Sequence, residues 1–127
     1  MRTTIHVCTT CRSGDEPLEP KEARSGARLY RELSARANDG AFEVVPVECL
    51  SVCKRPVTIG FSAPGKWSYI YGDFPPDGSA DTILDAAQLY ADAPDGLIPW
   101  KNRPAEIKRG VVARIPPALA QFHEAAE

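Results

Sequence analysis

The sequence lacks most of the patterns that would assign a protein directly to a class of enzyme. It contains no G-x-G-x-x-G, P-loop, H-E-x-x-H or G-x-S-x-G motif, so nucleotide binding, zinc-protease chemistry and serine hydrolysis have no support. It also has no apolar run that approaches membrane-spanning length, and its start has no apolar signal region. We therefore expect a cytoplasmic protein that does not act on a membrane and is not an enzyme.

An excess of charge of one sign is also absent. The chain has 15 basic and 17 acidic residues, a formal net charge of -2, which gives no general reason to bind nucleic acid. Its 127 residues, 43% of them hydrophobic, suffice to bury one core without disulfide bonds. The composition therefore predicts a single compact unit.

Cysteine is scarce, and the four that occur form two close pairs. Cys8 and Cys11 make a C-x2-C motif, and Cys49 and Cys53 make a C-x3-C motif. In a reducing compartment such pairs are more typical of metal ligands or redox groups than of two permanent disulfides. The cysteines are therefore the first candidates for a functional site.

Alternation and helical periodicity predict a mixed α/β order, in which a βαβ unit is followed by a β-hairpin and a helix. Pro46 favours an edge position for the second strand, and Gly26 weakens the first helix. The predicted elements are strand 4–7, helix 21–38, strand 42–48, hairpin strands 57–62 and 67–71, and a helix capped by Asp77 or Ser79 and ending near Ala93.

Each predicted helix has an apolar stripe that should face the core. After the second helix, proline interruptions allow only short helices near 105–109 and 118–126. The stripes are Ala23, Ala27, Tyr30, Leu33 and Ala37 in the first helix, and Ala80, Ile83, Leu84, Ala87 and Ala91 in the second.

Both cysteine pairs directly follow predicted strands. If the two strands are parallel neighbours joined by a crossover helix, the loops that leave them emerge at the same edge of the sheet. Ligands in open α/β sheets bind beyond that edge. The topology therefore predicts that four thiols meet in one place.

Four sulfur ligands suit zinc or an iron-sulfur cluster, and they exclude calcium-type sites. Zinc sites commonly repeat C-x2-C, whereas the second pair here is C-x3-C. Dithiol redox chemistry at Cys8 and Cys11 is a further alternative. It is less favoured because such a nucleophile is usually activated at a helix N-terminus, and here a loop containing glycine and proline follows Cys11.

The βαβ-hairpin-helix order with a late C-x3-C resembles the thioredoxin-like 2Fe-2S ferredoxins. The segments 48–55, 62–67 and 71–73 are more closely similar to the predicted metal-binding proteins of domain-of-unknown-function family 1636. The resemblance implies a thioredoxin-like ferredoxin domain, which we place at residues 1–96, and it suggests possible homodimers. The proline interruptions lead us to expect an irregular C-terminal extension over 97–127, packed on this domain. Our hypothesis for the function is a one-electron carrier for a redox partner protein, and neither the charge balance nor the hydropathy gives a reason to expect a nucleic acid or membrane partner.

The resemblance further implies the ligands of a 2Fe-2S cluster: Cys8 and Cys11 on one iron, Cys49 and Cys53 on the other. Structural zinc held by the same four cysteines, in an interaction module or metal carrier, remains the alternative cofactor. Lys54 and Arg55 are candidates for tuning the potential or for docking, because cations near an anionic cluster favour its reduced form. His6 and His123 are not expected to be ligands.

Aromatic and basic residues outside the cysteine loops have simpler expected roles. Trp67, Tyr69 and Tyr71 alternate onto one face of a strand and are expected to pack. Basic residues outnumber acidic ones between 97 and 114, which could steer an acidic redox partner. They are Lys101, Arg103, Lys108, Arg109 and Arg114, against the single acidic residue Glu106.

Overall fold

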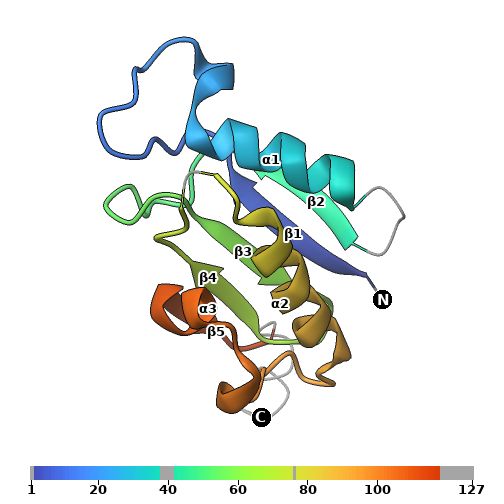
Figure 1. Cartoon of the computed structure of the whole chain (residues 1–127). Helices are drawn as coiled ribbons and strands as arrows, with labels where there is room; N and C mark the ends of the chain where they lie inside the picture. Colours follow the sequence, from blue (N-terminus) through green and yellow to red (C-terminus); the bar gives the residue numbers. More distant parts are fainter. Residues whose placement is uncertain (1, 38–41, 76, 118–127) are drawn as a thin grey trace, which may run out of the picture.

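Five strands form one mixed sheet, and the helices α1 and α2 lie on the same face of it (Figure 1). The computed structural model describes residues 2–37, 42–75 and 77–117. In chain order the elements are β1 (Thr3–Cys8), the 3₁₀ helix η1 (Lys21–Ala23), α1 (Ser25–Arg36), β2 (Phe42–Val47), β3 (Ile59–Ser62), β4 (Ser68–Tyr71), α2 (Ala80–Asp92), the 3₁₀ helix η2 (Trp100–Asn102), α3 (Ala105–Gly110) and β5 (Val111–Ile115).

The strand order β2-β1-β3-β4-β5 contains one parallel pair, β1 with β2, and three antiparallel pairs. Thr3 is opposite Phe42 and Cys8 is opposite Val47, so β1 and β2 run in register from end to end. The predicted βαβ unit and hairpin are confirmed. As Pro46 suggested, β2 lies at the edge of the sheet.

The core lies between the sheet and the two long helices. In β1, Ile5 and Val7 are fully buried, and they alternate with the half-buried Thr4 and His6. The rings of Tyr69 and Tyr71 stack with centroids 5.5 Å apart. The expectation that this aromatic strand packs is therefore confirmed for both tyrosines.

The buried face of α1 differs from the predicted stripe. Ala23 is exposed and Ala27 and Tyr30 are only partly buried, whereas Gly26 and Leu29 join Leu33 in the core. The reason is that residues 21–23 form a 3₁₀ turn and Arg24 is extended, so the helix starts only at Ser25. The predicted apolar stripe was therefore on a different face of the helix, because the helix was predicted to begin at residue 21 and begins at Ser25.

The second helix follows its prediction more closely. Ala80, Ile83 and Ala87 are buried as expected, but Leu84 and Ala91 are half-buried and Ala86 and Tyr90 take their place in the core. Ser79 occupies the cap position, yet its hydroxyl donates to the Pro75 carbonyl at 2.9 Å instead of capping the helix. No helix within the described residues is both long and apolar enough to cross a membrane.

The segment after residue 96 is more regular than expected. The short helix near 105–109 is confirmed as α3, and the following residues form β5, which pairs with β4 and was not predicted. The helix expected over 118–126 falls outside the described residues. The C-terminal segment thus supplies the fifth strand of the same sheet (Figure 1).

Candidate metal centre

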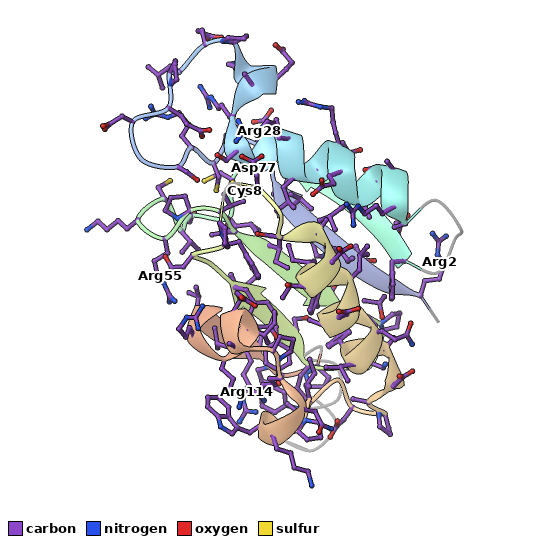
Figure 2. All side chains as sticks on the ribbon, in the orientation of Figure 1. Arg2, Cys8, Arg28, Arg55, Asp77 and Arg114 are labelled. Atoms are coloured by element: carbon purple, nitrogen blue, oxygen red, sulfur yellow. The ribbon has the colours of Figure 1, made fainter. Side chains whose placement is uncertain are left out.

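All four cysteines line one cavity of about 130 Å³ at the edge of the sheet where β1 and β2 end. Cys8 is the last residue of β1, and Cys49 lies two residues beyond the end of β2. Figure 2 shows Cys8 at this edge, between the loop that follows β1 and the loop that follows β2. The two cysteine pairs therefore lie at the same cavity, as the topology predicted. The other residues that line this cavity are Thr10, Arg12, Val52 and Pro56.

The four thiols are free and differ in exposure. Cys8 and Cys11 are buried, whereas Cys49 and Cys53 are exposed. Within the described residues, no three His, Cys, Asp or Glu side chains are gathered closely enough to hold a single metal ion. The thiols thus share one cavity wall without converging on one point.

The Cys8 and Cys11 thiols shift each other's pKa in opposite directions. Although burial opposes ionisation, the neighbouring Cys11 thiol stabilises a thiolate at Cys8 and lowers the pKa of Cys8 to about 4. The backbone N–H groups of Leu50 and Thr10 lower the pKa of Cys8 further. The pKa of Cys11 is raised, because it keeps the shared proton and is buried. One thiolate is therefore favoured in this pair, and Leu50 brings the second cysteine loop into contact with the first.

Two hydroxyl groups that the sequence did not single out touch these sulfurs. The Thr58 Oγ1 atom lies 3.4 Å from Cys11 Sγ, and Thr10 Oγ1 lies 3.7 Å from Cys8 Sγ. The Thr10 hydroxyl also donates to the Glu48 carbonyl, which ties the first loop to the end of β2. No spacing or periodicity marks either threonine, because both contacts depend on how the strands pair.

The second loop bends sharply around Cys49. Ser51 has a φ of 62°, and its backbone N–H donates to Cys49 Sγ at 3.2 Å. A left-handed conformation is uncommon for a residue other than glycine. This conformation points the Ser51 N–H at the Cys49 sulfur, and hydrogen bonds of this kind shift the reduction potential of thiolate-bound clusters.

The first turn of α1 packs directly on the Cys8–Cys11 pair. The Gly26 N–H donates to the Cys11 carbonyl at 3.1 Å, and a Cβ on Gly26 would lie 2.0 Å from the Cys8 carbonyl oxygen. The loop containing glycine and proline does follow Cys11, as predicted, but it folds back and brings the start of α1 against this pair, a contact that the sequence did not indicate. The partial positive charge of a helix N-terminus stabilises nearby thiolates.

The fold-back of this loop depends on Glu16. Its Oε1 accepts hydrogen bonds from the Ser13 N–H at 2.8 Å, the Ser25 N–H at 3.1 Å and the Ser25 hydroxyl at 2.6 Å. Its Oε2 accepts from Arg28 at 3.0 Å, and Arg28 also binds Asp77 (Figure 2). Glu16 therefore joins the loop after Cys11 to the start of α1. No sequence pattern indicates this role for a single acidic residue in a loop.

We predict that Glu16→Gln destabilises the fold by about 2 kcal/mol at neutral pH, the scale of charged hydrogen bonds. Burial opposes ionisation, but hydrogen bonds from Ser25, Ser13 and Arg28 lower the pKa of Glu16 to about 2. A depressed carboxyl pKa stabilises the fold above the unfolded-state value near 4.3, and this stabilisation is lost as the pH falls toward 2.

Urea unfolding of the wild type and of Glu16→Gln between pH 7 and pH 2.5 checks this prediction. The difference between the two proteins should be constant above about pH 5 and shrink below it. Glu19→Gln, in the same loop at an exposed residue, is the matched control and should show no comparable loss. A difference that does not change with pH would contradict the role given to the Glu16 carboxylate.

The two cations beside Cys53 have different surroundings. Lys54 is exposed, whereas Arg55 forms an ion pair with Asp73 at 2.7 Å and donates to the carbonyls of Arg109 at 3.1 Å and Val111 at 3.4 Å. The Arg55 side chain thus links the end of the cysteine loop to α3 and β5.

His6 is not among the residues that line the cavity described above. The Nε2 atom of His6 pairs with Ser62 Oγ at 2.8 Å, on a different part of the sheet. His123 lies outside the described residues. Lys66 is not among the residues that line the cavity, and it donates to the carbonyls of Tyr90 and Ala91 near the end of α2.

Comparison with solved structures supports the fold. A thioredoxin-like [2Fe-2S] ferredoxin from Aquifex aeolicus is similar, with a TM-score of 0.55, 18% identity, and coverage of 92% of this chain and 96% of that chain. A wild-type crystal structure of such a ferredoxin from the same organism matches with a TM-score of 0.53 and 16% identity over 88% and 97% of the two chains. At this identity the likeness establishes a shared thioredoxin-like fold, as predicted.

The sequence comparisons identify the family. No curated protein matches the chain. A family model described as a protein of unknown function, DUF1636, matches residues 5–117, which include all four cysteines and every strand from β2 to β5. The chain therefore belongs to the DUF1636 family.

Proposed function

We propose that this protein is a 2Fe-2S ferredoxin that carries one electron at a time. The observation that carries the proposal is that four free thiols from two separate loops line the same cavity. The loops are brought together by the parallel pairing of β1 and β2. The thioredoxin-like fold shared with structures of 2Fe-2S ferredoxins adds support.

The residues on this wall suit such a cluster. We propose that Cys8 and Cys11 hold one iron and that Cys49 and Cys53 hold the other. Four thiolates are the usual ligand set of a 2Fe-2S centre, which supplies a site for one-electron oxidation and reduction when bound. The N–H donor of Ser51 on Cys49 and the start of α1 beside Cys8 and Cys11 would stabilise negative charge on the sulfurs.

The exposure of the thiols fits an electron carrier. Cys8 and Cys11 are buried beneath the first turn of α1, while Cys49 and Cys53 are exposed. Electron transfer between proteins needs one edge of the centre to lie near the surface. We therefore propose that the loop over 49–53 is the edge through which electrons enter and leave.

Two alternatives make different use of the same cysteines. In a dithiol protein, the low pKa of Cys8 and the helix start beside it would activate a nucleophile. Cys49 and Cys53 would then have no role, although they line the same cavity. In a zinc protein, all four thiols would bind one ion and its oxidation state would never change.

Metal analysis of protein purified without oxygen separates these proposals. A 2Fe-2S protein should be coloured, contain iron and acid-labile sulfide in equal amounts at about two each per chain, and lose colour with dithionite. A colourless protein with one zinc per chain would overturn the proposal. A metal-free protein in which Cys8 and Cys11 form a reducible disulfide would favour the dithiol alternative.

Lys54 and Arg55 offer a matched pair of substitutions at this centre. An exposed charge near the cluster is worth about 0.2–1 kcal/mol, or roughly 10–40 mV for one electron. Lys54→Ala should lower the reduction potential by about this amount and leave the unfolding midpoint unchanged.

Arg55→Ala should also lower the unfolding midpoint, because it leaves Asp73 and the two carbonyls near β5 without their partner. Potentiometric titration and thermal unfolding of both variants check the contrast. Equal stability of the two variants would contradict the linking role of Arg55.

A further inference from the structure

The described C-terminal segment carries a concentration of positive charge that contrasts with the chain as a whole. Residues 97–117 contain five of the 15 basic residues but one of the 17 acidic residues, and the whole chain has a net charge of -2. Within the described residues none of these five cations takes part in an ion pair. We use the name basic face for these five cations, Lys101, Arg103, Lys108, Arg109 and Arg114, together with Trp100.

Three of the cations of the basic face, Arg103, Lys108 and Arg114, lie over aromatic rings. The Arg103 and Lys108 side chains both lie over the Trp100 ring at 5.3 Å. Arg103 also lies over Tyr69 at 5.7 Å, and Tyr69 is the β4 partner of Arg114 across the sheet. Arg114 in turn lies over Trp67 at 5.0 Å. These cations are therefore held in place before any partner binds, which lowers the entropy cost of binding.

An exposed tryptophan lies within this positive surface. Trp100 is 61% exposed, although tryptophan is among the residues most often buried in interfaces. Lys101, the next residue, and Arg109, which follows Lys108, are exposed as well, and Val112 and Ile115 add exposed apolar area on β5. Exposed Trp and Arg surrounded by further cations is the composition of a protein-binding hot spot with electrostatic steering.

The basic face is connected to the candidate metal centre. Arg55, two residues after Cys53, donates to the carbonyls of Arg109 and Val111. The Gly72 N–H donates to the Gly110 carbonyl at 2.8 Å, and the close approach of these two residues leaves no room for a Cβ on Gly110. Figure 2 shows Arg55 between the cysteine loop and α3. A partner bound on α3 and β5 would therefore contact elements that are hydrogen-bonded to the end of the loop with the exposed cysteines.

We propose that the basic face docks an acidic redox protein; this rests on the proposed electron-carrier function and names the class of its partner. Charge complementarity selects an acidic surface and would speed encounter despite the net negative charge of the chain. A single-stranded nucleic acid is less suited, because its bases need open aromatic rings for stacking and cations already lie over Trp100.

Calorimetric titration with an acidic flavodoxin tests the proposal. We expect association at low salt, at least tenfold weaker when the ionic strength rises from about 20 to about 300 mM. The double variant Lys101→Glu with Arg109→Glu should bind at least tenfold more weakly at low salt, and Trp100→Ala should also weaken binding. Arg31→Glu, an exposed charge reversal on α1, is the matched control and should bind like the wild type.

Several results would overturn the docking proposal. One is the absence of salt-dependent association with flavodoxin, and another is that Arg31→Glu weakens binding as much as the double variant does. A third is that the basic protein cytochrome c or a single-stranded oligonucleotide binds more tightly than flavodoxin. The colour and iron content of the same sample report separately on the proposed function. A colourless protein that still binds flavodoxin through the basic face would sink the ferredoxin proposal alone, and a coloured protein that does not bind would sink the docking proposal alone.

Discussion

Replacing Cys49 with serine is expected to abolish stable binding of the proposed cluster. Cys49 is exposed and its sulfur receives the Ser51 N–H, so the substitution removes a ligand without opening a cavity in the core. A serine oxygen is a much poorer ligand than a thiolate for iron in such clusters. Protein prepared without oxygen should lose most of its visible absorption and its iron, while the secondary structure measured by circular dichroism is kept.

Ser51→Gly provides the matched control in the same loop. Ser51 has a φ of 62°, a conformation that glycine adopts without cost. The variant keeps the backbone N–H that contacts Cys49, so it should retain colour and be as stable as the wild type or about 1 kcal/mol more stable. An unchanged spectrum for Cys49→Ser would remove that residue from the proposed ligand set.

Gly26→Ala is expected to cause the largest loss of folding stability. The new Cβ would lie 2.0 Å from the Cys8 carbonyl oxygen and 3.2 Å from Cys11 Cβ, and the first of these contacts is with backbone that cannot turn away. Overpacking of this kind costs about 3 kcal/mol. At an exposed helix position, replacing glycine by alanine would instead stabilise the fold by up to about 1 kcal/mol. A loss of stability in Gly26→Ala would therefore indicate that the new Cβ is crowded.

Denaturant unfolding and iron content together measure the consequence of Gly26→Ala. Because α1 must move away from the cysteine pair, we expect both a lower midpoint and less iron bound per chain. Ala35→Gly, at an exposed residue of the same helix, reports the effect of helix propensity alone and should cost about 1 kcal/mol without affecting iron. A Gly26→Ala protein of wild-type stability would show that α1 does not pack on the cysteines as described.

The meeting of the four cysteines at one cavity was predictable because each pair lies at the end of a strand that the local sequence marks. Cys8 and Cys49 follow strands whose β-branched residues mark them clearly, and the pairing of parallel strands at one edge needs no further detail. The same argument predicted the hairpin, where Gly65 with a φ of 74° completes the turn expected from Pro64.

The remaining features depend on contacts between segments that are distant in sequence. Gly26 weakened the predicted helix, yet the fold requires it because the Cys8 backbone lies against it. Glu16 acts through Ser25 and Arg28, which no motif connects to it. The strand β5 lies between prolines and has only one paired neighbour, β4, so its exposed residues lack the alternation that marks strands.

The most direct test of the central claim is electron paramagnetic resonance of the anaerobically prepared protein before and after reduction by dithionite. A 2Fe-2S centre held by Cys8, Cys11, Cys49 and Cys53 should be silent when oxidised and give a signal of spin one-half after taking up about one electron per chain. We expect this signal to be present in the wild type and absent in Cys49→Ser. A wild-type protein that takes up no electron and contains one zinc per chain would contradict it.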